Sequence, residues 1–187
     1  MNIADEYHTQ WHDYMAMIQS ERWTRAFEGK VLKGSSWPNP APFVITLNDR
    51  NTTEIRTALI EMINNAKESV IIEHAYFSDD KVIEAVKLVA ERGITAPRVF
   101  LYPQMMHAKA VLTDGVIAAI GSANLTPRSM KTSREVTMFV HCKAGDPFIK
   151  RLHEQMEADM AESEEVITPF KLGTSGKIKA LFGKYLW

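Results

Sequence analysis

Along this chain, apolar residues recur at a helical period in some segments and form short strand-like runs in others. Apolar residues at a helical period predict amphipathic helices, and short apolar or alternating runs predict strands. The predicted helices cover residues 4–27, 53–67 and 148–160, together with one that is capped by residues 78–80 and ends at Gly93. The predicted strands cover residues 43–47, 70–77, 99–102, 107–113, 116–120 and 135–141.

The order of these elements predicts an α/β fold with a mixed sheet flanked by helices. Strand, helix and strand follow one another over residues 70–102, which is typical of a βαβ unit with a parallel sheet. Asp114-Gly115 separates two further strands and is a strong signal for a tight hairpin. Residues 29–42 are rich in glycine, serine and proline, as linkers are. The length of 187 residues favours one domain with its own core.

Composition narrows the class of protein. Apolar residues make up 45% and charged residues 24%, which is typical of a soluble globular chain. The net charge of −1 makes non-specific nucleic-acid binding an unlikely function. No apolar run approaches the roughly 20 residues that span a bilayer, and the first residues do not resemble a secretory signal. Cys142 is the one cysteine, so no internal disulfide is possible and a reducing, cytoplasmic location fits.

The candidate chemistry is concentrated between His107 and Asn124. His107 and Lys109 are two positions apart on a predicted strand, so they project from the same face. The hairpin returns the chain and brings Ser122 and Asn124 near His107. A cationic amine with neutral hydroxyl and amide donors can bind a phosphate and stabilise developing oxyanion charge. The pattern therefore predicts a phosphate site.

The imidazole of His107 can attack phosphorus or protonate a leaving alkoxide. Glu135, on the next predicted strand, can accept a hydrogen bond from Nδ1 of His107 and leave Nε2 free for chemistry. A metal site is less plausible, because a protonated lysine beside the histidine is not a ligand and repels a cation. We therefore expect neither a metal nor an organic cofactor.

These residues resemble the HKD motif of the phospholipase D superfamily: His-x-Lys-x4-Asp, then Gly-Ser-x-Asn, then a downstream Glu. Residues 71–77, 82–93 and 122–128 are similar to the C-terminal half of bacterial cardiolipin synthase-like enzymes. The resemblance implies the following roles: His107, Lys109 and Asp114 as catalytic residues, Lys109, Ser122 and Asn124 as phosphate-binding residues, and Glu135 as the residue that orients His107.

The resemblance also implies an activity and its partners. The expected reaction is phosphatidyl transfer or phospholipid phosphodiester hydrolysis through a phosphohistidine. The expected substrates are anionic glycerophospholipids such as phosphatidylglycerol. Two HKD halves form one site in such enzymes, so the expected partner is a second half. The choice between transferase and hydrolase, and the lipid headgroup, stay open.

The sequence departs from the family pattern in two places. It holds one HKD motif, and residues 2–13 resemble the segment that follows the first motif of a two-motif enzyme. Residues 94–98 are short where family members have a strand, a loop and often a helix. We therefore expect residues 1–40 to be the end of a first half, 41–165 to be the phospholipase D-like domain, and 166–187 to be a separate basic tail.

Several alternatives remain open. A single-motif endonuclease completes its site as a homodimer, and an inert half-domain would only bind a partner. Asp114, Ser122 and Asn124 can be turn residues, and Glu135 a solvated strand end. The tail places Ile178, Leu181, Phe182, Tyr185 and Leu186 at helical spacing among lysines, which suits peripheral contact with the cytoplasmic membrane face. The same helix can instead pack on the domain or on the missing half.

Overall fold

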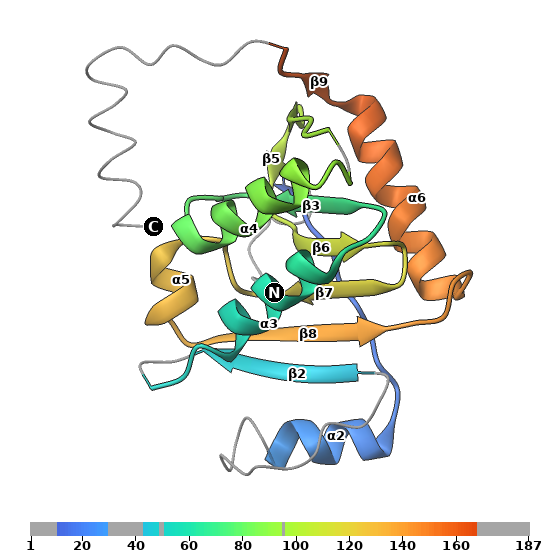
Figure 1. The fold of residues 1–187 in the computed structure, drawn as a ribbon. Helices are drawn as coiled ribbons and strands as arrows, with labels where there is room; N and C mark the ends of the chain where they lie inside the picture. Colours follow the sequence, from blue (N-terminus) through green and yellow to red (C-terminus); the bar gives the residue numbers. More distant parts are fainter. Residues whose placement is uncertain (1–10, 30–42, 49–50, 95, 168–187) are drawn as a thin grey trace.

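A five-stranded sheet forms the centre of the computed structural model, which describes residues 11–29, 43–48, 51–94 and 96–167 (Figure 1). Its strand order is β2-β8-β7-β6-β3, and every neighbouring pair runs antiparallel. The strands are β2 (Phe43–Asn48), β3 (Val70–His74), β6 (Lys109–Thr113), β7 (Ile117–Gly121) and β8 (Glu135–His141).

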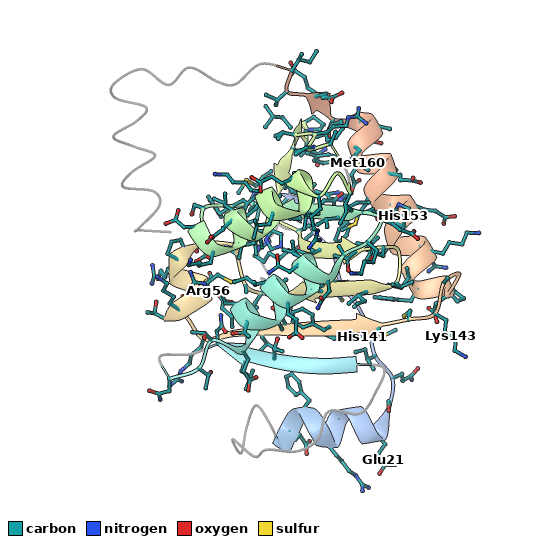
Figure 2. All side chains as sticks on the ribbon, in the orientation of Figure 1. Glu21, Arg56, His141, Lys143, His153 and Met160 are labelled. Atoms are coloured by element: carbon teal, nitrogen blue, oxygen red, sulfur yellow. The ribbon has the colours of Figure 1, made fainter. Side chains whose placement is uncertain are left out.

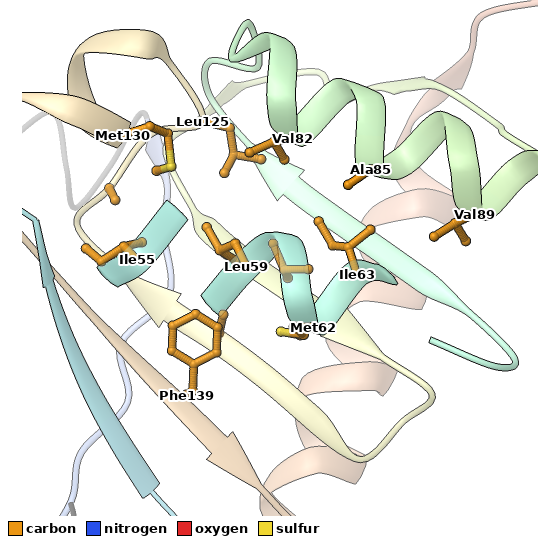
Figure 3. Close-up of a cluster of buried hydrophobic side chains, with 13 residues drawn as sticks. Ile55, Leu59, Met62, Ile63, Val82, Ala85, Val89, Leu125, Met130 and Phe139 are labelled. Atoms are coloured by element: carbon orange, nitrogen blue, oxygen red, sulfur yellow. The ribbon is translucent and has the colours of Figure 1, made fainter. Parts of the chain in front are cut away.

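Helices cover both faces of this sheet. On one face lie α3 (Glu54–Asn65) and α4 (Asp80–Glu91), whose buried side chains meet Leu125 and Phe139 in a cluster shown in Figure 3. On the other face lies α6 (Pro147–Glu162), which packs on Ala110, Ala118 and Val140. The chain therefore has a helix–sheet–helix layering with a core on each side.

Local side-chain chemistry sets several element ends. Asp79 caps α4 by accepting from the backbone N–H groups of Lys81 and Val82, and it also pairs with Arg56 of α3 at 3.0 Å. Arg56 is labelled in Figure 2. At the β6–β7 hairpin, Asp114 (φ 53°) and Gly115 (φ 60°) lie in the left-handed region, and Val116 N–H donates to Thr113 O at 3.0 Å. These are the features of a type I′ turn, as the Asp-Gly pair predicts.

Much of the predicted architecture is confirmed, namely the α/β class with flanking helices, the hairpin, α3, α4, α6, β2 and β8. The expected parallel pairing within the sheet is wrong. Strands β2 and β3 run in the same direction with α3 between them, but they form opposite edges of the sheet. The β6–β7 hairpin and β8 occupy the space between, because hydrophobic patterning does not specify which strands become neighbours. The predicted strand at 99–102 is β4 (Phe100–Leu101), which pairs with β9 (Glu164–Glu165) outside the main sheet.

The long helix predicted over residues 4–27 is also wrong for its described part. Only α2 (Glu21–Phe27) is helical, and residues 13–20 have no regular structure. Instead, β1 (Trp11–His12) pairs in parallel with β5 (Met105–Met106). The aromatic residues at helical spacing make tertiary contacts, which outweigh local helix propensity. Residues 4–10, most of the expected linker and the tail from 168 lie outside the described residues.

Candidate active site around His107

The backbone of His107 is held by a short N-terminal segment, residues 11–14, which we call the strap. The carbonyl of His12 accepts from the N–H groups of His107 at 2.7 Å and Ala108 at 3.0 Å. His107 lies two positions before Lys109, the first residue of β6. The strap and β6 therefore fix the two residues that the motif places together.

The imidazole of His107 has a partner at each nitrogen. Nδ1 lies 2.9 Å from Oδ2 of Asp13, and Nε2 lies 3.1 Å from Nζ of Lys109. An ammonium group only donates, so Nε2 presents its lone pair and Nδ1 carries the proton that Asp13 accepts. The ring also lies 5.0 Å from that of Trp11. The geometry thus selects one tautomer and leaves Nε2 as the nucleophilic or basic nitrogen.

Lys109 is only 8% exposed, and it also donates to the carbonyl of His107 at 2.6 Å. Burial lowers the pKa of this ammonium, and the charges of Asp13 and Glu135 oppose that effect. His74 is the register partner of Lys109 on β3. Burial, helped by the charge of Lys109, lowers the pKa of His74 to about 3, so its imidazole is neutral at physiological pH.

The carboxylate of Glu135 accepts from the hydroxyl of Ser122 at 2.5 Å and from that of Ser129 at 3.0 Å. Nδ1 of His107 bonds to Asp13, so an orienting role for Glu135 stays a prediction. Strand β7 lies between β8, which carries Glu135, and β6. Asp13 takes the position expected for Glu135, and its approach depends on a tertiary contact across 94 residues.

The Gly-Ser-x-Asn segment lies at the end of β7. Ser122 is pinned to β8, since its N–H donates to the carbonyl of Val136 at 2.9 Å and its Oγ accepts from Val136 N–H at 3.1 Å. Asn124 Oδ1 and His74 Nδ1 are buried and have no hydrogen-bond partner among the described residues.

Asp114 does not join this group. It follows the opposite end of β6 from Lys109, roughly 16 Å away at the usual rise of a strand. Its carboxylate accepts from the backbone N–H groups of Lys67, Glu68 and Ser69 at 2.8–3.1 Å. Burial raises its pKa, but these backbone hydrogen bonds, from Ser69 first, lower it overall. Asp114 therefore anchors the α3–β3 connection, and the catalytic role that the resemblance implies does not fit its position.

Other histidines lie elsewhere. His12 contacts Asp159 at 2.8 Å. His141 and His153 are at the end of β8 and on α6 (Figure 2). Within the described ranges, no group of three or more His, Cys, Asp and Glu could hold a metal ion. In the same ranges, every helix is too short or too polar to cross a bilayer.

Comparison with known proteins is consistent with this geometry. A family model described as "Cardiolipin synthase, PLD-like domain" matches residues 96–160. Cardiolipin synthase from Listeria welshimeri is 26% identical over 151 residues, covering 65% of this chain and 30% of the relative. Cardiolipin synthase A from Pseudomonas aeruginosa is 35% identical over 136 residues, covering 57% of this chain and 27% of the relative. The chain thus spans less than a third of the length of these relatives.

Solved structures show the same fold. The phospholipase D family member Nuc from Salmonella typhimurium has a TM-score of 0.57 at 14% identity, covering 67% of this chain and 99% of that one. Phosphatidylserine synthase from Haemophilus influenzae has a TM-score of 0.59 at 11% identity, covering 79% of this chain and 46% of that one.

Proposed function

Because this chain is related to the cardiolipin synthases of the phospholipase D superfamily, we propose that it contributes His107 to phosphatidyl transfer or phospholipid phosphodiester hydrolysis. The observation that carries the proposal is the hydrogen-bonded set of Asp13, His107 and Lys109. The proposed substrates are anionic glycerophospholipids such as phosphatidylglycerol, because a buried ammonium beside a nucleophilic nitrogen suits a phosphodiester anion.

The first step forms a covalent intermediate. Nε2 of His107 attacks phosphorus, a P–N bond forms, the P–O bond to the leaving group breaks, and an acid protonates the departing oxygen. Nζ of Lys109, now 3.1 Å from Nε2, moves to a phosphoryl oxygen and stabilises the developing charge. The phosphohistidine ring is cationic, and the carboxylate of Asp13 at Nδ1 stabilises it.

The second step releases the product. An alcohol or water gives its proton to the group that acted as the acid, its oxygen attacks phosphorus, and the P–N bond breaks to regenerate neutral His107. An alcohol yields a new phosphodiester and water yields a phosphatidic acid. Both steps use acid–base and nucleophilic chemistry alone, so the scheme includes no metal ion or organic cofactor.

The acid has to come from a second half. In an in-line displacement the nucleophile and the acid lie on opposite sides of phosphorus, so one imidazole cannot do both. His74 is a poor substitute, because its pKa of about 3 leaves it without a proton to donate at neutral pH. We therefore propose that a second HKD half completes the site, either a first-half polypeptide or an identical chain across a two-fold axis.

An activity assay across a protein dilution series tests this function, with the mass determined by light scattering at each concentration. Labelled phosphatidylglycerol is offered in vesicles, with and without a first-half polypeptide, and duplex DNA is offered in parallel. We expect lipid turnover that follows the dimer fraction or appears on adding the first half. Full specific activity in a demonstrated monomer contradicts the shared site, and cleavage of DNA without lipid turnover supports the homodimeric nuclease instead.

The covalent intermediate has its own test. Brief reaction with substrate labelled in the phosphatidyl group, followed by denaturation, is expected to leave acid-labile label on the chain and none on His107→Asn. Sedimentation with anionic vesicles tests the proposed peripheral contact of residues 166–187, with a chain that ends at residue 167 as the control. Equal sedimentation of both chains contradicts a role for the tail.

A further inference from the structure

A buried group of polar side chains is hydrogen-bonded to His12 and Tyr14 of the strap. Tyr14 places its hydroxyl within hydrogen-bond distance of Glu73 Oε2 on β3 and Asp159 Oδ2 on α6, the latter at 2.5 Å. Glu73 is 8% exposed and Asp159 3% exposed. We call Tyr14, Glu73, Asp159 and His12 the carboxylate cluster. It joins the strap to both the sheet and α6.

Counting protons shows how the cluster is held. One hydroxyl has one proton to donate, so two contacts from Tyr14 to carboxyl groups require a second proton on one of them. Asp159 also accepts from His12 Nε2 at 2.8 Å and Gln155 Nε2 at 2.9 Å, which suits a carboxylate. Glu73 is then the protonated member, which donates to Tyr14 while Tyr14 donates to Asp159. Such a chain of hydrogen bonds is mutually reinforcing.

The environment of Glu73 supports this assignment. Burial raises its pKa to about 7; the charge of Asp159 adds to this rise and the charge of His12 opposes it. Burial and the two carboxyl groups also raise the pKa of Tyr14, so its hydroxyl keeps its proton. Glu73 therefore loses its proton near neutral pH, and two carboxylates then compete for one hydroxyl.

The cluster is adjacent in sequence to the group that orients His107. Asp13, which accepts from His107 Nδ1, lies between His12 and Tyr14, and the carbonyl of His12 accepts from the backbone of His107. Any shift of the two cluster side chains on the strap therefore moves Asp13. The carboxylate of Asp13 accepts from the backbone N–H of Tyr14 at 2.9 Å as well as from His107, so it joins the two groups directly.

We propose that Tyr14 is a positioning residue for His107: its bridge between Glu73 and Asp159 holds the strap where Asp13 fixes the imidazole tautomer, and loss of the proton on Glu73 releases the strap. The inference rests on the proposed role of His107. In this proposal the carboxylate cluster makes the role of His107 depend on pH, because the strap contacts both the cluster and His107.

The charged and titratable groups around Glu73 favour this behaviour. His12 and Tyr14 face it from the strap and Asp159 from α6, while Tyr102 lies at the edge with its ring 4.8 Å from that of His12. Tyr102 donates to Glu162 of α6 at 3.2 Å, at the exposed rim. The groups around Glu73 are thus mainly acidic. Deprotonation of Glu73 adds a negative charge among them, and His12 is the basic residue nearby.

The test reads the tautomer of His107 directly, by ¹⁵N NMR of the imidazole in the full chain. The signals are assigned by their loss in His107→Asn. We expect the parent to hold the Nδ1–H tautomer at pH 6 and to lose it progressively towards pH 8. Tyr14→Phe is expected to lower the population of the Nδ1–H tautomer at both pH values. Tyr102→Phe removes a hydroxyl from the rim, and we expect it to behave as the parent does.

Glu73→Gln separates positioning from mere packing. Its amide stays neutral and can still donate to Tyr14, so we expect the Nδ1–H tautomer to persist from pH 6 to pH 8. An unchanged tautomer in Tyr14→Phe, or an equal change in Tyr102→Phe, overturns the proposal. If circular dichroism shows that Tyr14→Phe does not fold, Glu73→Gln decides: a pH dependence equal to that of the parent overturns the proposal.

The tautomer of His107 is measured without turnover, so failure of the positioning proposal can be distinguished from failure of the proposed function. A parent chain that shows the expected tautomer and its pH dependence, but no phosphodiesterase activity as a dimer or with the first half added, supports the positioning role and contradicts the catalytic one. In an active preparation, we expect Tyr14→Phe to lower kcat by about tenfold and leave KM unchanged, as loss of an oriented base does.

Discussion

The two ends of β6 carry residues of the same sequence motif but differ in what they do. At one end, Lys109 and the adjacent His107 form a pair whose polar atoms face a site, with Asp13 behind the imidazole. At the other end, Asp114 uses its carboxylate to bind three backbone N–H groups at the start of β3. At one end the reactive nitrogen is paired with the ammonium of Lys109, and at the other the carboxylate is bonded to backbone N–H groups.

This difference teaches that residues of one motif need not share a role. A motif of fixed spacing can be retained for geometry at one end and for chemistry at the other. Asp114 holds the hairpin and the α3–β3 connection, which fixes where β6 ends. Substitutions at the two ends should therefore separate activity from stability.

The largest effect is expected for His107→Asn. Loss of a general acid or base alone costs about 10²–10⁴-fold, and loss of a nucleophile costs more. The measurement is phosphodiesterase turnover in a preparation complemented with the second half, with circular dichroism to confirm the fold. Turnover within a few-fold of the parent would reject His107 as the reacting group and remove the contrast between the two ends.

Lys109 is expected to rank next. Lys109→Met should lower turnover by about 10²–10³-fold, since it removes a donor placed for developing charge. Lys109→Arg should rescue poorly, because a planar guanidinium cannot replace a compact ammonium in this buried position. Full activity of the arginine variant indicates a general electrostatic role at the surface, contrary to specific positioning.

Asp13 sharpens the comparison between the two ends of β6, because it bonds to His107 at one end but is not a residue of the motif. Asp13→Asn should lower turnover by roughly 10²-fold, since the amide can donate to Nδ1 and favour the wrong tautomer. Glu135→Gln is the matched control. It weakens the contacts with Ser122 and Ser129 but leaves Nδ1 of His107 bonded to Asp13. Equal changes of the His107 tautomer in both variants would contradict this assignment.

Asp114→Ala should have the smallest effect on turnover per folded molecule, within about twofold, but a clear effect on stability. It removes the acceptor of the N–H groups of Lys67, Glu68 and Ser69, at a cost of about 1 kcal/mol, because water replaces the acceptor at the exposed Lys67 and Glu68. The measurement is guanidinium-induced unfolding. A loss of turnover comparable to that of His107→Asn in folded Asp114→Ala would restore a catalytic role.

The same residue gives a pH dependence whose sign is set by its pKa. The folded-state pKa of Asp114 lies below the ordinary value of 3.8. Its contribution to the free energy of unfolding is therefore present above that value and is lost as the pH falls through the folded-state pKa. Asp114→Asn should show a smaller loss of stability than the parent on acidification below about pH 4.

The sequence predicts much of the fold and only part of the site, for reasons that particular residues make plain. Helices α3, α4 and α6 follow from apolar periodicity, and the β6–β7 turn follows from Asp114-Gly115. These are local signals, so no knowledge of distant contacts is needed. His107 and Lys109 come together for the same reason, since they are two positions apart on one chain segment.

The parts that sequence analysis misses depend on distant pairing. Glu135 belongs to a strand that β7 separates from β6, and strand order is not written in the spacing of apolar residues. Asp13 reaches His107 because the strap is extended, whereas its aromatic spacing predicts a helix. The Trp11-His12-Asp13 segment gave a signal only through its resemblance to sequence that follows a first motif, and that signal does not specify its contact.

The strap also has a consequence for the order in which the molecule folds. Its contacts join residues far apart in sequence, 94 positions for Asp13 with His107 and 145 for Tyr14 with Asp159. The β6–β7 hairpin closes a short loop, whereas the strap closes long ones, and closing a longer loop costs more chain entropy. We expect the hairpin and its neighbouring helices to form first and the strap to dock last. A chain can then complete most of its core while His107 still has no fixed tautomer. The hydrogen-bonded arrangement of Asp13 and His107 is therefore completed in the final event of folding.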